Sequence, residues 1–372
     1  MVRKVVRPAL HFCRHYTQHV LVHMVYYARL LKGGERWRPI RPKNAQMHSI
    51  APDLPEILLV DYDLLTTPVV GQHPVLSPPE GWHPQTSLSL EEALPFPWSK
   101  TYTDEYGQLF QPVVFWRNAI ALDEYLKSEQ DPARQLAALT LANLLLERLR
   151  AFTVRDGDAA FIENRFALNS TSPALDAPWV SAISNAFAIL GCLRLSKHLA
   201  VDEDLLMYGR AFQGIHTQGG VAPGRWISFR DRAGYLWFDE YPLPNGRATR
   251  VQNGHIFAVL ALHELSLNFP GRDFGTLTRA GATTIEATVA CFRRPGTYSR
   301  YALGRWFEGD YLPGRAIRQL YQLYELTGAQ RFLSYGDLLL KDTRSDLSQT
   351  YLDTVTFARK AALRRRPQSV SE

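Results

Sequence analysis

Apolar residues recur at the spacing of amphipathic helices along most of the chain after residue 108. Proline, glycine and aspartate punctuate this pattern: Asp131-Pro132 precedes one apolar run, and Gly328 follows another. Successive helical hairpins with loops on one side predict a mainly α protein, an (α/α) toroid whose cleft lies among the loops of one rim. The helices are predicted at residues 112–128, 132–152, 174–199, 203–213, 249–268, 275–292, 313–327, 329–341 and 350–365.

Two kinds of segment depart from the helical pattern. Residues 37–100 are rich in proline, which interrupts helices, so we expect extended chain with small β elements packed on the body. Strand-like pieces are predicted at Ala159–Ala167, Trp226–Phe229 and Tyr235–Phe238. The predicted parts are an N-terminal helix with the Pro-rich region (1–100), the toroid (101–345), and a C-terminal helix with a basic tail (346–372).

The first predicted helix, residues 9–31, carries His11, His15, His19 and His23 at intervals of four. This spacing places them on one slowly drifting stripe. A metal site is one interpretation, but no carboxylate stands at a supporting spacing. The other interpretation is a mildly basic amphipathic helix that docks on the body or rests on a membrane surface.

Composition changes this picture in one respect, the excess of arginine. Of 42 basic residues 34 are Arg, against 36 acidic residues and a net charge of +6. Arginine binds carboxylates and sulfates through two parallel hydrogen bonds and stacks on rings, and 12% of the residues are aromatic. This combination suits an anionic, ring-containing ligand, although an Arg-rich codon usage would produce the same composition.

Several function classes find no support in the sequence. Its three cysteines are scattered, which fits neither a disulfide framework nor a zinc site and indicates a reducing compartment. The motifs of nucleotide-binding loops, zinc proteases and α/β-hydrolases are missing, and the basic residues are interspersed with acidic ones. We therefore predict no cofactor, no metal and no nucleic acid. No apolar stretch is long enough to span a bilayer, and the N-terminus does not resemble a signal peptide.

Three windows concentrate polar and aromatic residues. In Trp226–Asn253, the carboxylates Asp239 and Glu240 precede Tyr241 and two prolines, with arginines nearby. The other two windows are Gly296–Arg318, which alternates Tyr and Arg, and Asp176–Leu190, which starts a helix. Guanidinium groups favour the phenolate form of a neighbouring tyrosine, which suits proton transfer. Taken singly, each window is equally well explained as a surface turn, aromatic packing or a buried helix.

Together, and in this order, the windows resemble the C-terminal domain of the D-glucuronyl C5-epimerase family, which converts glucuronate to iduronate in heparan-type polysaccharides. The resemblance runs from about residue 104 to about residue 342. It rests on five short elements: APWVSA at Ala177–Ala182, DEYP at Asp239–Pro242, Asn253-Gly254, Tyr301 in SRYAL, and Asp310-Tyr311. The chain departs from the family where Ala302 follows Tyr301 and Leu312 follows Tyr311.

The resemblance implies an epimerase that removes the C5 proton of a uronate and returns one to the opposite face. Glu240 would act on one face and Tyr311 or Tyr301 on the other, with Tyr241 beside them. An anionic uronic-acid polysaccharide would be the partner, in a cytoplasmic bacterial protein that contacts the membrane through residues 9–31 at most; a homodimer is compatible with it. The residues expected to bind substrate, with Arg305 and Arg250 first for its carboxylate, are Trp179, Asn185, Arg230, Arg250, Asn253, Arg305 and Arg315.

Three other functions stay open at this point. A polysaccharide lyase would use the same base and then eliminate the group at C4. An inverting hydrolase would need two carboxylates about 6.5–9.5 Å apart, such as Glu240 with Glu163 or Asp176. A glycan-binding protein without activity is the third.

Overall fold

The computed structural model describes residues 39–50, 52, 54–69, 78–96, 110–169, 171, 173–218, 225–296, 299–303, 310–311 and 313–366. The predicted helix at residues 9–31, with its histidine stripe, lies outside these ranges. From Ile40 onward the chain forms one compact unit. No helix within the described ranges is long and apolar enough to cross a bilayer.

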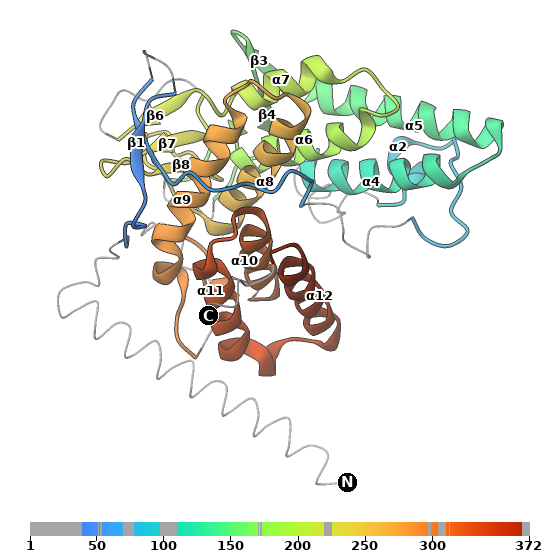
Figure 1. Cartoon of the computed structure of the whole chain (residues 1–372). Helices are drawn as coiled ribbons and strands as arrows, with labels where there is room; N and C mark the ends of the chain where they lie inside the picture. Colours follow the sequence, from blue (N-terminus) through green and yellow to red (C-terminus); the bar gives the residue numbers. More distant parts are fainter. Residues whose placement is uncertain are drawn as a thin grey trace, which may run out of the picture. The chain divides into compact units, whose positions relative to one another are not determined.

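Helices account for about half of the described residues (Figure 1). Proline opens α4 (Pro112–Ser128), α5 (Pro132–Ala151) and α10 (Pro313–Thr327), as expected for a residue that favours the first turn. The remaining helices are α2 (Leu90–Ala93), α6 (Ala182–Leu195), α7 (Asp202–Arg210), α8 (Gln252–Asn268), α9 (Phe274–Phe292), α11 (Gln330–Thr343), α12 (Gln349–Arg365) and the 3-10 turn η1 (Arg344–Asp346).

Short strands form four small sheets between the helices. In one, β4 (Ala159–Asn164) pairs antiparallel with both β3 (Thr153–Asp156) and β5 (Trp179–Val180). In another, β7 (Ser228–Arg230) runs parallel to β6 (Ile215–Thr217) and antiparallel to β8 (Leu236–Phe238). The other two sheets are the hairpins of β1 (Gln46–His48) with β2 (Ile57–Leu59) and of β9 (Ser299–Arg300) with β10 (Asp310–Tyr311).

Four helices form an inner row in the order α4, α6, α8, α10, each packed on the next. The others lie outside it: α5 packs on α4, α9 on α8, and both α11 and α12 on α10 (Figure 1). Helix α8 lies inside the row of helices because its sequence has no polar face to expose to solvent. Every residue from Gln252 to Leu265 is buried.

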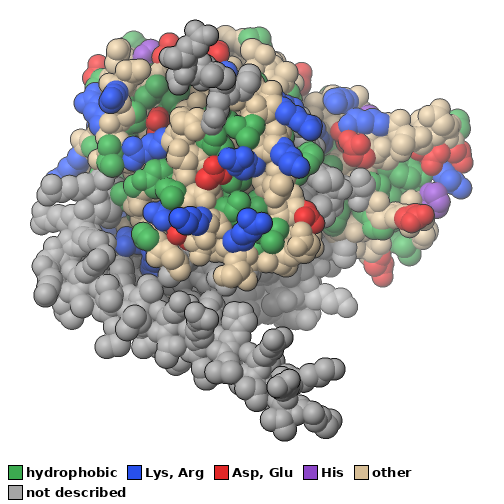
Figure 2. All heavy atoms as spheres, turned by 60° about the horizontal axis from the view of Figure 1, so that its bottom comes forward, with side chains coloured by type: hydrophobic (Ala, Val, Ile, Leu, Met, Phe, Trp, Pro, Cys, Tyr) green, Lys and Arg blue, Asp and Glu red, His purple; other side chains and the backbone are tan. Residues whose placement is uncertain are grey.

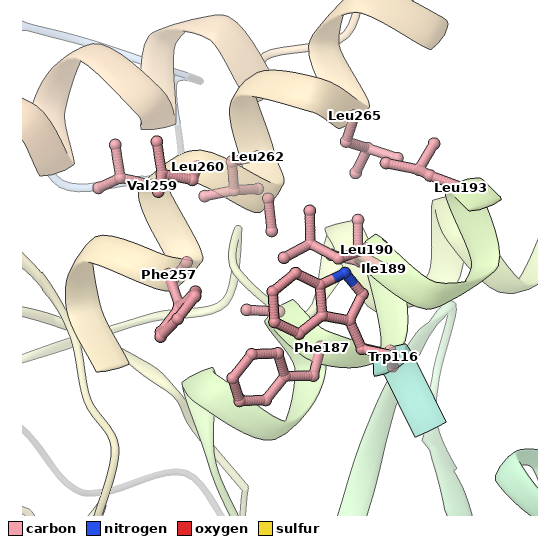
Figure 3. Close-up of a cluster of buried hydrophobic side chains, with 14 of the residues drawn as sticks. Trp116, Phe187, Ile189, Leu190, Leu193, Phe257, Val259, Leu260, Leu262 and Leu265 are labelled. Atoms are coloured by element: carbon pink, nitrogen blue, oxygen red, sulfur yellow. The ribbon is translucent and has the colours of Figure 1, made fainter. Parts of the chain in front are cut away.

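An aromatic cluster joins the first three inner helices. The Trp116 ring of α4 stacks on Phe187 of α6 with 5.3 Å between centroids. Phe257 of α8 lies 4.8 Å from Phe187, and aliphatic side chains of α6 and α8 extend the core around them (Figure 3). Because these rings lie near the first turns of α6 and α8, they hold together the end of the helix row where the candidate site lies.

The helices predicted after residue 108 are confirmed with one exception. The segment predicted as one helix at 174–199 begins instead at Ala182, because Trp179 and Val180 pair with β4 as a strand. The strand-like pieces are confirmed in shortened form as β4, β7 and β8. The residues around Gln46–Leu59 form the small β hairpin expected in the Pro-rich region.

Candidate active site

Two buried carboxylates leave β8 side by side, Asp239 at 0% and Glu240 at 6% exposure. The backbone around them is held by the neighbouring elements. Asp239 N–H donates to the Ile227 carbonyl at 2.8 Å, and the Asp239 carbonyl accepts from Ala182 N–H at 3.0 Å. Ser181 Oγ donates to the Glu240 carbonyl at 2.6 Å. The first turn of α6 is thereby fastened to the chain at Glu240.

The Asp239 carboxylate closes the loop that follows it. It accepts hydrogen bonds from Thr249 N–H at 2.9 Å, Thr249 Oγ1 at 2.7 Å and Arg250 N–H at 2.9 Å. Arg250 has a left-handed backbone with φ of 57°, a conformation that a long side chain adopts only when its surroundings hold it. Burial raises the pKa of Asp239 to about 6 although these hydrogen bonds oppose the shift. We assign Asp239 a structural role, that of holding the loop.

The Glu240 carboxylate belongs to a chain of three proton-bearing groups. Tyr301 Oη donates to Glu240 Oε1 at 2.8 Å, and the hydroxyls of Tyr241 and Tyr301 are 3.0 Å apart. Tyr301 stands 61 residues from Glu240 in sequence but adjacent to it in space. The antiparallel bridge between Val251 and Ala302 explains this proximity, since it places the chain after β9 beside the start of α8.

Burial raises the pKa of Glu240 to about 7, and the negative charge of Asp239 adds to that increase. The hydroxyls of Tyr301 and Tyr241 and the guanidinium of Arg315 oppose the shift. Burial, together with Glu240, also raises the pKa of Tyr301, which therefore keeps its proton and donates it. A carboxyl group that titrates near neutral pH can both accept and release a proton, as a general acid–base catalyst must.

Gly254, in the first turn of α8, leaves the space that Glu240 occupies. A Cβ at this position would lie 2.4 Å from Glu240 Oε2 and 2.9 Å from Glu240 Cβ. Any side chain larger than hydrogen would therefore push the carboxylate from its place.

Glu240 and Tyr241 both face a cavity of about 210 Å³. Five of its thirteen lining residues are aromatic: the Trp179 ring lies 5.7 Å from that of Tyr241, and Trp179 Nε1–H donates to the Phe166 carbonyl at 2.8 Å. The polar groups of the lining are few, as in most ligand sites. The lining residues are Phe110, Gln111, Pro112, Val113, Asn164, Phe166, Trp179, Ser181, Ile183, Ser184, Phe187, Glu240 and Tyr241.

The first turns of the inner helices lie at this same end of the molecule. Those of α4 and α6 line the cavity, that of α8 contacts Glu240 through Gly254, and that of α10 carries Arg315. Helix N-termini attract negative charge through their free N–H groups and the helix dipole. The rim is thus suited to an acidic ligand.

The segment that holds this site matches a known family: residues 157–335 fit the family model described as D-glucuronyl C5-epimerase C-terminus. These residues form a C-terminal domain of the D-glucuronyl C5-epimerase family. The resemblance seen in the sequence is confirmed over this range. No curated protein matches the chain.

The epimerase-family domain contains all three linked residues, Glu240, Tyr241 and Tyr301. Helix α4 and Phe110 precede it, so one wall of the cavity comes from outside the matched range. The backbone of Tyr311 lies in β10, paired with Ser299, while its side chain lies outside the described residues, as does all of Arg305.

Of the other residues expected to bind substrate, three line the cavity or lie near Glu240, and three make their contacts elsewhere in the domain. Trp179 lines the cavity, and the Arg315 charge acts on Glu240. Asn253 is buried beside Gly254, and its carbonyl accepts a hydrogen bond from Gln319. The remaining three are engaged elsewhere in the domain, and their contact with substrate stays a prediction.

The Asn185 amide is used inside the fold, since Oδ1 accepts from Ile162 N–H at 3.0 Å and Nδ2 donates to the Ala160 carbonyl at 2.8 Å. Arg230 Nε donates to the Glu56 carbonyl. The Arg250 guanidinium lies over the rings of Trp237 and Phe229, at 5.8 and 5.9 Å. The Asn185 contacts hold β4, and the contacts of Arg230 and Arg250 hold the sheet of β6, β7 and β8 and the loop that follows it.

Sequence reasoning missed Asn164, Ser184, Phe166 and Gly254. Asn164 Nδ2 lies 3.4 Å from Ser184 Oγ, and both residues line the cavity. The alternation along β4 puts Asn164 on this face and turns Glu163 to the other, where it pairs with Arg165 at 3.2 Å. Glu163 is therefore poorly placed to be the second carboxylate of a hydrolase.

Proposed function

We propose that the protein epimerises D-glucuronate residues of an anionic polysaccharide at C5, producing L-iduronate. The observation that carries the proposal is Glu240, a buried carboxyl with a pKa of about 7 that faces a cavity and is hydrogen-bonded to Tyr301. The family of residues 157–335 supports the same chemistry. Removal and return of a proton changes no oxidation state, so the proposal needs no redox cofactor.

The C5 proton is weakly acidic because it stands next to a carboxylate, so its removal requires a positioned base and stabilisation of the enediolate-like intermediate. Glu240 in its ionised form takes this proton. A tyrosine then supplies one from the opposite face. Tyr241 is the candidate among the described side chains of the cavity wall, and Tyr311 stays the alternative that the resemblance implies.

Proton transfers through Tyr301 can return Glu240 and Tyr241 to their starting protonation states after each turnover. When Tyr241 has given its proton to C5, Tyr301 returns one to the Tyr241 phenolate. Tyr301 in turn recovers a proton from the protonated Glu240. Each O–H bond that breaks is matched by one that forms, and the carboxylate is restored for another cycle. The distances of 2.8 and 3.0 Å along this chain support direct transfer.

The substrate carboxylate would be held by the N-termini of the inner helices and by arginine side chains. Arg315 is the best supported of these, because its charge already acts on Glu240. Arg305, Arg250, Arg230 and Asn185 remain the further residues proposed to contact the sugar chain, whereas Asn253, which does not line the cavity, is proposed to act beside Glu240.

Shape and charge favour a polymer over a small acid. The cavity of about 210 Å³ is smaller than the range of about 300–1,000 Å³ typical of drug-sized ligands, so it admits one sugar ring. The rest of the polysaccharide would lie on the protein surface along the rim of the proposed toroid. Residues 313–366 hold ten Lys and Arg against five Asp and Glu. Figure 2 shows basic side chains outnumbering acidic ones on the described body of the lower face of Figure 1.

The test is incubation with a non-sulfated glucuronate polymer in heavy water, followed by NMR at C5 and ultraviolet absorbance. Deuterium at C5 in an intact chain that contains iduronate is the expected result. A conjugated double bond would indicate the lyase, and new reducing ends without one would indicate the hydrolase. Glu240→Gln should abolish exchange, whereas Glu163→Gln, which changes a carboxylate on the opposite face of β4, should leave it intact. Normal exchange in Glu240→Gln would refute the role of this residue.

A further inference from the structure

Three buried side chains near the candidate base, and the base itself, have polar atoms without a hydrogen-bond partner in the described part of the chain. Gln252 is 1% exposed, and neither its Oε1 nor its Nε2 is paired. Gln319 is 0% exposed with an unpaired Oε1, and Asn253 has an unpaired Oδ1. The fifth such atom is Glu240 Oε2, the carboxylate oxygen to which Tyr301 does not donate.

Hydrogen bonds and close contacts bring these residues together at the first turn of α8 and the second turn of α10. Gln319 Nε2 donates to the Asn253 carbonyl at 3.1 Å, which brings the Gln319 amide to the start of α8. Gln252 N–H donates to the Tyr301 carbonyl at 3.1 Å. Glu240 Oε2 lies against the Cα of Gly254, the residue that follows Asn253. These contacts place the three amide-bearing residues at the start of α8, next to the glycine that contacts Glu240 Oε2.

Unpaired buried amides are costly, and native proteins pair nearly all such groups with protein or with ordered water. Buried water typically makes about three hydrogen bonds to polar groups that protein atoms leave unpaired. Here donors and acceptors are both present, as a water molecule requires. Gln252, Asn253 and Gln319 do not line the cavity of Glu240 and Tyr241, so a hydroxyl of a sugar in that cavity is a poor candidate for the partner.

We propose that Gln252, Asn253 and Gln319 bind ordered water against Glu240 Oε2, and that this water exchanges the Glu240 proton with solvent. The water site stands by itself; its catalytic use rests on the proposed function. After Glu240 has taken the C5 proton, its Oε2–H bond breaks and an O–H bond forms on the bound water. That water releases one of its protons to the next, and by the reverse transfer a solvent proton returns to Glu240 Oε2, so the proton that Glu240 passes to Tyr301 comes from solvent and bulk water has no net gain.

Glu240 then has two routes for its proton. Through Oε1 the proton passes to Tyr301 and Tyr241 and can return to a sugar, while through Oε2 it passes to solvent. Loss of the water route should leave the substrate-derived proton inside the site for longer. This difference is measurable with an isotope.

A crystal structure of the full chain at a resolution that shows water tests the site without any assay. The expected result is water within hydrogen-bond distance of Glu240 Oε2 and of the Gln252 or Gln319 amide. A site that excludes water, with the amides paired to protein atoms, would overturn the proposal. So would a sugar hydroxyl in the place of the water in a structure with glucuronate oligosaccharide.

The isotope test uses polymer deuterated at C5 in ordinary water, with deuterium counted in the iduronate formed over many turnovers, because a substrate-derived deuteron reaches a later sugar only through Tyr301 and Tyr241. Gln252→Met and Gln319→Met keep the side-chain length but remove the amide, and each should raise deuterium retention at least threefold. Gln322→Met, one turn further along α10, is the matched control and should retain as little as the unchanged protein. Unchanged retention in both variants would overturn the relay. Absence of iduronate with the unchanged protein would instead overturn the proposed function, and the crystallographic result would still decide the water site.

Discussion

Replacing Gly254 by alanine is the sharpest single perturbation of the candidate base. The added methyl carbon would lie 2.4 Å from Glu240 Oε2 and 3.1 Å from Glu240 Cδ. Ordinary van der Waals contact begins near 3.4 Å, so the carboxylate must move by about 1 Å. A displacement of that size at a reacting group can reduce the rate about 100-fold. We therefore expect kcat/KM for C5 exchange to fall by about two orders of magnitude, equivalent to about 2.7 kcal/mol.

Stability should change much less than activity. Alanine favours a helix over glycine by up to about 1 kcal/mol, whereas overpacking costs about 1–3 kcal/mol, so a net loss of no more than about 2 kcal/mol is expected. Gly275 in the first turn of α9 is the matched control, because a Cβ there meets nothing closer than Arg279 at 3.4 Å. Gly275→Ala should be fully active. Wild-type exchange in Gly254→Ala, with Glu240 unmoved in its crystal structure, would refute the reasoning.

The remaining predictions concern charge and the cavity wall. Since the base must be ionised, kcat/KM for exchange should rise with pH through about 7 and level off above it; a flat profile from pH 5 to 9 would contradict this. Tyr301→Phe removes a hydrogen bond that lowers the Glu240 pKa, so the rising limb should move to higher pH. Because the folded-state pKa of Glu240 is raised, its ionisation costs up to about 3 kcal/mol of stability as pH rises from about 4.5 to 7, and urea titrations of Glu240→Gln should lose this decline. Trp179→Ala should raise KM at least tenfold with a smaller change in kcat, while the opposite split would place Trp179 in the chemistry.

Most of the helices could be predicted because the residues that start and end them stand at those positions in the sequence. Pro112, Pro132 and Pro313 stand at the first positions of their helices, and Gly328 follows the end of α10 with a φ of 71°. The start of α6 could not be predicted this way. Trp179 and Val180 carry no helix breaker after Pro178, and their strand exists through pairing with β4, a tertiary interaction.

In the candidate site too, some residues could be predicted from the sequence, while others depend on how distant segments pack together. Glu240, Tyr241 and Tyr301 were predicted from ordered sequence elements, and the structure brings their side chains together. Contact of Asn185 with substrate stays a prediction, whereas its neighbour Ser184 lines the cavity, because a shift of one residue turns a helical side chain by about 100°. Gly254 was noted only as part of a motif. Its approach to Glu240 depends on how α8 meets β8, which no local pattern encodes.

One wall of the cavity is formed by Phe110, Gln111, Pro112 and Val113. Residues that would recognise the sugar and residues that transfer protons therefore lie in different segments of the chain. Glu240 and its two tyrosines belong to the matched segment 157–335, while this wall belongs to the residues before it. A fragment starting at residue 157 would keep every linked acid–base group but lose four of the thirteen lining residues and the Trp116 support under Phe187. Substitutions in α4 can accordingly alter which sugar polymer is accepted while the proton-transfer groups stay the same, so the two properties are free to evolve at different rates.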